Sequence, residues 1–280
     1  METRARATKR LHLLSLFQKP AWHKAVLTGK RIYYGSRGEP IQFGSHRLRY
    51  VPGTRPVKLK YADSPDVVVR NDACQVRYFL ERIQPSEFVL DIGANVGQYA
   101  VLFGALVGPT GRVISFEPDP NHRVLLSRNV QLNNFRERVT VEAAALSDEN
   151  GTHVFFSRND QMSSLVRSGL GTNADAPDVI ANEVNTFRLD DYLEANQLPT
   201  PQWVKLDTEG AEINILRGAQ RLLRSSATVV CELHPYAWNE FNTSYSELLS
   251  IVGECGKKLK YLDPSLKVED GPVHGAIIIS

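Results

Sequence analysis

The sequence predicts an α/β fold in which strands and helices alternate along most of the chain. One observation is an apolar run, Phe88–Ile92, that leads through a glycine-containing loop into a segment with the apolar spacing of a helix. Another is a second apolar run, Arg112–Phe116, that ends at an acidic residue, Glu117. The alternation then continues towards the C-terminus. Together these patterns indicate a nucleotide-binding domain.

The expected elements begin with a helical stretch in residues 1–30. Short strands separated by glycine, proline and serine follow at 31–34, 41–43, 48–51, 57–61 and 67–69. A helix at 77–83 leads into core strands at 88–92, 112–116, 139–144, 203–206 and 228–232. Further helices are expected at 97–107, 120–133, 210–224 and 244–255, and further strands at 258–262 and 276–280. Residues 157–185 are polar and contain glycine and proline, so we expect a long loop there, of the kind that often forms a lid.

The loop after the first core strand is not a dinucleotide-binding loop, although it contains glycines. That motif would need glycine at two positions that hold Asn95 and Gln98. The missing third glycine argues for a ligand without a pyrophosphate. S-adenosylmethionine fits, since glycine lets the backbone approach its charged amino-acid tail and helix N–H groups can bind the tail's carboxylate. The cofactor-binding candidates in this loop are Asp91, Gly93, Asn95 and Gly97.

Glu117 is a candidate for binding the ribose of that cofactor. It ends the second core strand, and a carboxylate there has two acceptor oxygens for a pair of ribose hydroxyls. The alternative is that Glu117 caps the next helix, a role that Asp119 or Asn121 could also fill. In combination with the glycine loop, we favour the ribose interpretation.

Seven motifs in the same order resemble the FkbM-type S-adenosylmethionine-dependent methyltransferases. The resemblance runs from Asp91 to His234, roughly half of the chain. The motifs are Asp91–Gly97, Phe116–Pro118, Asn129–Asn133, Leu189–Leu193, Lys205–Glu212, Leu216–Ala219 and Glu232–His234.

This resemblance implies a class I methyltransferase fold, which is a Rossmann-like sheet of seven strands with helices on both faces and an antiparallel last strand. It implies S-adenosylmethionine as the cofactor and methyl transfer to oxygen, often on a sugar or polyketide hydroxyl, without naming the acceptor. By the same resemblance, Ala145 and Leu146 would line the adenine. Ser163 and Ser164 match a serine-rich part of the family's loop and could contact the cofactor tail or the acceptor, or only make the loop polar.

Four residues at strand ends are the catalytic candidates. Ligands of such sheets bind outside the carboxyl ends of the strands, which places Asp207, Glu209, Glu232 and His234 near the methyl group. The acceptor hydroxyl must lose its proton, and His234 has an unperturbed pKa of about 6.5, suited to a base. Asp207 is the alternative base, or it could hold the acceptor hydroxyl or the donor's amino group.

Each of these candidates also has a structural interpretation. Glu209 and Glu212 could favour the dipole of a helix that begins nearby, and His234 could simply end a strand. The other six histidines are read as structural or solvent-facing. Carboxylates with a histidine could also bind a divalent cation, but their spacing is not diagnostic, so no metal is expected.

The N-terminal part of the chain is basic. Residues 1–70 carry 15 Lys and Arg against 4 Asp and Glu, whereas residues 71–280 carry 18 against 27. We therefore divide the chain into a small basic extension, 1–70, and a methyltransferase domain, 71–280. The extension suggests an anionic partner such as a charged glycan, a lipid headgroup, a membrane surface or nucleic acid. Equally, it could dock on its own acidic domain.

Composition limits the setting in which the protein works. Apolar content of 42% and charged content of 23% are ordinary for a globular protein. No apolar run approaches the roughly 20 residues of a membrane span, and the N-terminal region is too polar for a signal peptide. Three widely spaced cysteines indicate a reducing compartment, so we expect a cytoplasmic protein. Nothing in the sequence indicates the oligomeric state.

Three functions compete at this point. The favoured one is an O-methyltransferase acting on a glycan or a small-molecule natural product. The second is a nucleic-acid methyltransferase that uses the basic extension to hold the phosphate backbone. Against it, the fourth core strand ends in Asp207-Thr-Glu-Gly210 and lacks the Pro-Pro-aromatic turn of amino-methylating enzymes. The third, a non-catalytic binding module, is disfavoured by the intact loop and the acidic strand ends.

Overall fold

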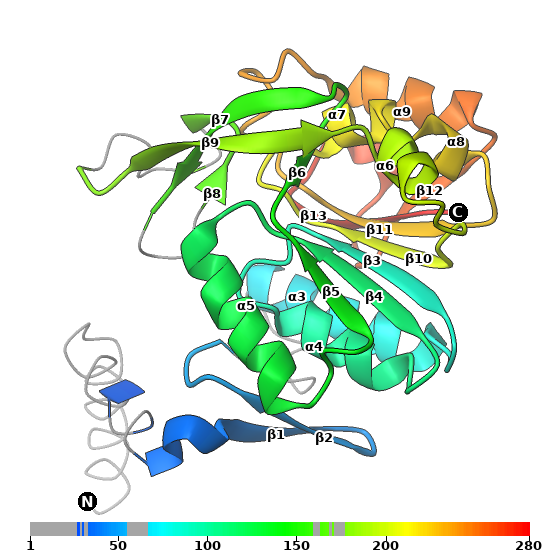
Figure 1. The fold of residues 1–280 in the computed structure, drawn as a ribbon. Helices are drawn as coiled ribbons and strands as arrows, with labels where there is room; N and C mark the ends of the chain where they lie inside the picture. Colours follow the sequence, from blue (N-terminus) through cyan, green and yellow to red (C-terminus); the bar gives the residue numbers. More distant parts are fainter. Residues whose placement is uncertain are drawn as a thin grey trace, which may run out of the picture.

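A seven-stranded sheet lies at the centre of the computed structural model, which describes residues 27, 28, 30, 33–54, 67–158, 163–167, 170 and 177–280. The strand order is β12-β13-β11-β10-β3-β4-β5 (Figure 1). All neighbouring pairs are parallel except those of β13, which runs antiparallel to β11 and β12. This arrangement confirms the expected class I methyltransferase fold with its antiparallel last strand. The strands are β3 (Phe88–Ile92), β4 (Arg112–Phe116), β5 (Val139–Glu142), β10 (Trp203–Leu206), β11 (Thr228–Leu233), β12 (Leu259–Tyr261) and β13 (Gly275–Ile279).

Helices cover both faces of this sheet, as Figure 1 shows. Side chains of β3 alternate between the faces: Val89 packs with the helices of one face, and Leu90 and Ile92 pack with those of the other. Because both faces are covered, β3 is buried along its whole length, which explains its nearly continuous apolar sequence. On the first face lie α3 (Val67–Arg82), α4 (Gln98–Leu106) and α5 (Pro120–Leu132). On the second lie α6 (Leu189–Ala195), α7 (Glu212–Arg217), α8 (Gln220–Leu223) and α9 (Tyr245–Glu254).

A second, four-stranded sheet includes part of the region in which the sequence predicts a long loop. Its order is β6-β9-β7-β8; β8 lies within the segment 157–185 and β9 begins in it, so the prediction was wrong for these residues. The polar sequence misled because β9 has one exposed face: Val184 and Thr186 are buried while their neighbours are not. The strands are β6 (Ala145–Leu146), β7 (Gly151–Ser157), β8 (Ser163–Ser164) and β9 (Ile180–Phe187).

Two helices differ from the sequence prediction. The helix expected at 210–224 is divided into α7 and α8, because Gly218 packs so closely on the backbone of Ser147 that a Cβ atom would lie 2.3 Å from its carbonyl oxygen. Helix α3 is longer than expected and includes 67–69, which had been predicted as a strand from its β-branched residues. Tyr33 and Tyr34 are also helical rather than extended. The elements expected at 57–61 and over residues 1–26 lie outside the described residues.

An N-terminal hairpin packs on the first face of the domain, against α4 and α5 (Figure 1). The Asn133 amide accepts a hydrogen bond from the Arg49 backbone N–H (2.8 Å) and donates to the Arg49 carbonyl (2.7 Å). One turn earlier, Asn129 Oδ1 accepts from the Val51 N–H (2.7 Å). Two amide side chains therefore hold the end of the hairpin much as a neighbouring strand would. The hairpin consists of β1 (Glu39–Phe43) and β2 (His46–Tyr50), preceded by a 3-10 turn, η1 (Gly35–Arg37).

The division of the chain at residue 70 stays a prediction. Helix α3 crosses that position, and Phe43, Leu48 and Tyr50 of the hairpin are buried in the same core as α4. A last 3-10 turn, η4 (Val268–Asp270), precedes β13. Among the helices in the described ranges, none is both long and apolar enough to cross a membrane.

Candidate active site

A cavity opens at the carboxyl ends of β3, β4 and β10 and receives most of the predicted cofactor residues. Its empty volume is about 610 Å³, including open solvent at its mouth. The predicted residues that line it are Gly93, Asn95, Glu117, Ala145 and Leu146, and the catalytic candidates Asp207 and Glu209 line it as well.

Gly93 is required where β3 approaches β10. Its φ is +78°, and a Cβ atom would lie 1.8 Å from the Asp207 carbonyl oxygen. Gly97 (φ +82°) has a different role, because its missing side chain lets the start of α4 pack on Leu126 of α5, and it does not line the cavity. Gly93 is therefore needed for the shape of the cavity, whereas Gly97 is needed for the packing of α4 on α5.

Asp91, which was predicted to bind the cofactor, does not line the cavity either. Its side chain is fully buried beside Lys205. Burial raises the pKa of the Asp91 carboxyl to about 7, although the Lys205 ammonium acts in the opposite direction. The structure thus places Asp91 in the wall behind the loop.

Glu117 is positioned by backbone groups of two loops. Its Oε2 accepts a hydrogen bond from Asn95 N–H (2.7 Å), and its Oε1 accepts one from Asp119 N–H (2.8 Å). Helix α5 is capped by Asp119, which accepts from the N–H groups of Asn121 and His122. Asp119, rather than Glu117, therefore caps α5. Each oxygen of Glu117 keeps a lone pair for a ligand hydroxyl.

Apolar side chains line the same cavity as Glu117. Ala145 and Leu146 form β6, and Phe155 of β7 and Leu165 pack beside them. Sequence reasoning did not identify Phe155 and Leu165, because Phe155 had no expected element and Leu165 fell in the presumed loop. Ser163 lines the cavity, and Ser164 donates a hydrogen bond to the Glu209 carbonyl oxygen (2.9 Å).

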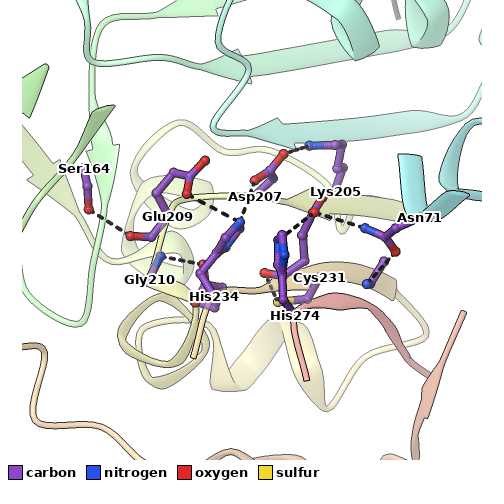
Figure 2. Close-up of polar contacts among 12 residues, drawn as sticks. Asn71, Ser164, Lys205, Asp207, Glu209, Gly210, Cys231, His234 and His274 are labelled. Carbon is purple, nitrogen blue, oxygen red and sulfur yellow. Dashed lines mark hydrogen bonds and ion pairs between the residues drawn. The ribbon is translucent and has the colours of Figure 1, made fainter. Parts of the chain in front are cut away.

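Three catalytic candidates meet at the ends of β10 and β11 (Figure 2). His234 Nε2 faces Glu209 Oε2 at 3.6 Å and Asp207 Oδ1 at 3.8 Å. Its other ring nitrogen, Nδ1, is hydrogen-bonded to Glu212 Oε1 at 2.8 Å. Glu212 is fully buried and also accepts from Trp238 Nε1 and Gly210 N, so it fixes the orientation of the imidazole.

The electrostatics of this cluster differ from the sequence expectation. Burial by itself would lower the pKa of His234, but the carboxylates of Glu212, Glu209 and Asp207 outweigh it and raise that pKa to about 10. Burial raises the pKa of Glu209, against the opposing effect of His234. In this arrangement His234 is an imidazolium at neutral pH, whereas a pKa near 6.5 had been assumed for it.

Glu232, the fourth catalytic candidate, has both carboxylate oxygens occupied by side-chain donors. Asn71 donates to Oε1 (3.0 Å) and Gln75 to Oε2 (2.8 Å), both from α3, and His274 Nε2 lies 3.3 Å from Oε1. Burial would raise the pKa of Glu232, but hydrogen bonding from His274 and the charge of His234 lower it to about 2. Glu232 thus ties α3 and the loop before β13 to the sheet.

Lys205 lies directly beneath Asp207. Its buried ammonium is 2.9 Å from Asp207 Oδ2 and lies over the ring of Tyr99, 4.5 Å from its centroid. The shared strand face of Lys205 and Asp207 follows from the two-residue period of a strand. Lys205 leaves Asp207 Oδ1 directed towards His234.

Further residues of this region were missed. Asp72 of α3 has a pKa raised to about 7 by burial and by the charges of Glu232 and Asp207. Tyr236 donates a short hydrogen bond to Glu209. His274 had been read as structural or solvent-facing, yet its ring centroid lies 5.0 Å from that of His234. Asp72, Tyr236 and His274 are spread along the sequence and belong to none of the predicted motifs, so their place in the site becomes apparent only from the fold.

The fold and this cavity define a class I methyltransferase domain. A family model described as the methyltransferase FkbM domain matches residues 91–259, more than half of the chain. The protein therefore belongs to the FkbM methyltransferase family.

Similar proteins include one named for a sugar acid and one named for methyl transfer to oxygen. The hexuronic acid methyltransferase AglP of Haloferax volcanii is 26% identical over 168 residues, which cover 59% of this chain and 64% of AglP. The 2-O-methyltransferase NoeI of Sinorhizobium fredii is 27% identical over 168 residues, covering 56% of this chain and 67% of NoeI. The matches thus span about two thirds of the length of these relatives.

Among solved structures, the methyltransferase FkbM from Methylobacillus flagellatus aligns with 76% of this chain and 53% of its own. The sequence identity is 18% and the TM-score is 0.44.

Proposed function

We propose that the protein transfers a methyl group from S-adenosylmethionine to a hydroxyl oxygen of a glycan or a small-molecule natural product. The observation that carries the proposal is the continuity of the cavity, which runs from Glu117 to Asp207 and Glu209. A carboxylate suited to a ribose and carboxylates suited to an acceptor hydroxyl therefore line the same space. Membership of the FkbM family supports the methyl donor.

In the proposed complex, Glu117 binds the ribose hydroxyls and Ala145 and Leu146 pack against the adenine. Gly93 and Asn95 lie against the amino-acid tail, near the N-terminus of α4, whose helix dipole suits its carboxylate. This orientation directs the sulfonium methyl group towards Asp207 and Glu209. Asp91 and Gly97 support the loop from behind.

The chemistry is an in-line displacement at the methyl carbon. The acceptor oxygen forms the new C–O bond, the C–S bond breaks, and S-adenosylhomocysteine leaves with the electron pair on sulfur. The hydroxyl proton goes to Asp207 or Glu209, since ionised carboxylates offer only acceptor atoms. His234 holds both carboxylates in place, and alignment of oxygen, carbon and sulfur supplies much of the rate.

The similarity to AglP, a hexuronic acid methyltransferase, supports a sugar as the acceptor, and the similarity to NoeI, a 2-O-methyltransferase, supports transfer to oxygen. A uronic acid would also be an anionic acceptor, in keeping with the basic N-terminal region.

We place the protein in the cytoplasm, because Cys74, Cys231 and Cys255 form no disulfide.

The test is methyl transfer from labelled S-adenosylmethionine to a panel of uronic acid glycosides, neutral glycosides and polyketide alcohols. We expect a methoxy product, identified by NMR, from at least one sugar in the panel. A methylated amine or nucleobase formed in preference to any hydroxyl would contradict the proposal.

A further inference from the structure

We propose that Asp207, Glu209 and His234 bind a divalent cation that holds the acceptor hydroxyl in front of the methyl group. This inference rests on the proposed function and adds to it a means of binding the acceptor. It also departs from the metal-free site that the sequence predicts. The three residues come from the ends of two neighbouring strands and face one another (Figure 2).

The separations between the three ligand atoms suit an ion between them. His234 Nε2 lies 3.6 Å from Glu209 Oε2 and 3.8 Å from Asp207 Oδ1, and the three atoms lie within 4.8 Å of one another. Nitrogen and oxygen ligands bind Zn²⁺ or Mg²⁺ at about 2.0–2.2 Å, so ligands on one ion lie at most about 4.4 Å apart. The observed separations from Nε2 fall within that limit.

The orientation of His234 is the second, independent observation. Its side chain is 4% exposed, and its Nδ1 is bound to the buried carboxylate of Glu212. A histidine that binds a metal almost always donates its other N–H in this way, to a carboxylate or a carbonyl. Nε2 faces the two oxygens as their ion-pair partner, and an ion bound among the three atoms would replace the ring proton on Nε2.

A second cluster, made of Glu232, His234 and His274, fits an ion less well. Both oxygens of Glu232 already accept hydrogen bonds from Asn71 and Gln75. In the first cluster, Glu209 Oε2 accepts a hydrogen bond from the Tyr236 hydroxyl, which an ion would replace. The carboxylates of Asp207 and Glu209 are instead 29% and 26% exposed and line the cavity, so an ion on them would have open positions towards the acceptor.

The mixed set of one imidazole and two carboxylates suits Mn²⁺ or Zn²⁺ better than an ion that prefers oxygen alone. An ion there would bind the acceptor oxygen and lower the pKa of its hydroxyl. It would also offset the negative charge of a uronic acid acceptor, which three nearby carboxylates, Asp207, Glu209 and Glu212, would otherwise repel.

The direct test is Mn²⁺ binding to the chelator-treated full chain, measured by calorimetry and by the loss of the free-ion EPR signal. We expect one ion per chain. Asp207→Asn and His234→Ala should each weaken binding at least tenfold, and Glu212→Gln, which only misorients the imidazole, about 10- to 100-fold. The matched control, His274→Gln, should bind Mn²⁺ as the unaltered protein does, because it belongs only to the second cluster. Circular dichroism confirms that each variant is folded.

Two results would overturn the proposal. One is the absence of Mn²⁺ and Zn²⁺ binding at millimolar concentration by folded protein, and the other is binding that His274→Gln removes and Asp207→Asn leaves intact. Methyl transfer at full rate in EDTA would likewise reject the ion while leaving the proposed function standing. Failure of the proposed function itself would appear separately, as absence of S-adenosylmethionine binding.

Discussion

Glu117 and His234 are both buried polar side chains at strand ends, yet they are held in different ways. Glu117 is fixed by backbone N–H groups of Asn95 and Asp119, which lie within 25 residues of it in the sequence. His234 is fixed by side chains of Glu212, Glu209 and Asp207. We call the first region the donor side, which comprises Gly93, Asn95, Glu117, Ala145 and Leu146. We call the second the acceptor side, which comprises Asp207, Glu209, Glu212 and His234.

The use of backbone partners on one side and side-chain partners on the other determines which substitutions each side tolerates. Backbone donors on the donor side persist whatever side chains surround them, so its geometry depends mainly on loop shape. On the acceptor side, each charged group holds another, and removing one leaves a buried charge unpaired, which costs several kcal/mol (about 3–5). The acceptor side should therefore respond to mutation as a unit.

The largest effect should follow from Asp207→Asn on the acceptor side. We expect kcat to fall about 10²- to 10⁴-fold, because a carboxylate that accepts the hydroxyl proton is lost. The Kd for S-adenosylmethionine should change only a few fold. Single-turnover kinetics with the best acceptor measures the first and calorimetry the second, with Asp270→Asn on the exposed surface as control. A normal rate would leave Glu209 as the base.

On the donor side, Glu117→Ala should reverse that pattern. Loss of hydrogen bonds between a charged group and the ribose typically costs about 1.5–3 kcal/mol, or roughly 10- to 100-fold in Kd for S-adenosylmethionine. Calorimetry is the measurement, and Glu137→Ala, at an exposed acidic residue, is the control. Unchanged affinity would remove Glu117 from the ribose role.

Asn129 tests whether the hairpin supports the donor side. Its amide donates to the Val96 carbonyl of the cofactor loop and to Thr54 Oγ1, and it accepts from Val51 N–H. Asn129→Ala should leave these buried groups unpaired and lower stability by about 1–3 kcal/mol. The melting temperature should fall by about 2 °C or more per kcal/mol. Gln131→Ala, on the exposed side of α5, is the control, and equal melting temperatures would show that the hairpin is dispensable.

Asp91 predicts a dependence of stability on pH. Its folded pKa of about 7 lies above the unfolded value of about 3.9, so its burial costs nothing below pH 4 and costs most above pH 7. Asp91→Asn should thus raise the melting temperature at pH 8 and leave it unchanged near pH 4, while Lys205 keeps its contact with Asp207. Thermal scans across this pH range decide the point; equal stabilisation at both ends would contradict the assigned pKa.

The smallest effect concerns the basic extension, residues 1–70, whose first 30 residues lie almost wholly outside the described part of the chain. Attraction of an anionic acceptor should weaken as salt rises past about 0.15 M, where the screening length is about 8 Å. Deleting 1–30 should flatten the dependence of acceptor KM on salt and leave donor binding intact. Identical salt curves for the two proteins would make residues 1–30 a structural extension only.

Sequence reasoning worked best where function depends on a local backbone motif. The strand, glycine loop and following acid predicted β3, β4 and the lining role of Gly93, Asn95 and Glu117. Sequence reasoning could not distinguish the role of Gly97, which serves helix packing, from that of Gly93, because the motif alone does not show what each glycine contacts.

It failed where side chains from distant segments meet. His274 and Asp72 carry no pattern of their own, and only the sheet brings them beside His234 and Asp207. The raised pKa of His234 likewise could not be predicted from the sequence, because it depends on three carboxylates that the fold brings together. The small sheet was missed because its strand β9 alternates buried and exposed residues within a polar sequence.

The central claim is that the donor and acceptor sides meet at the methyl group. A crystal structure of the protein with S-adenosylhomocysteine tests it most directly. We predict that both ribose hydroxyls lie within hydrogen-bond distance of Glu117, and that the sulfur faces Asp207 and His234. A ligand bound in the reverse direction, with its adenine beside Asp207, would contradict the account.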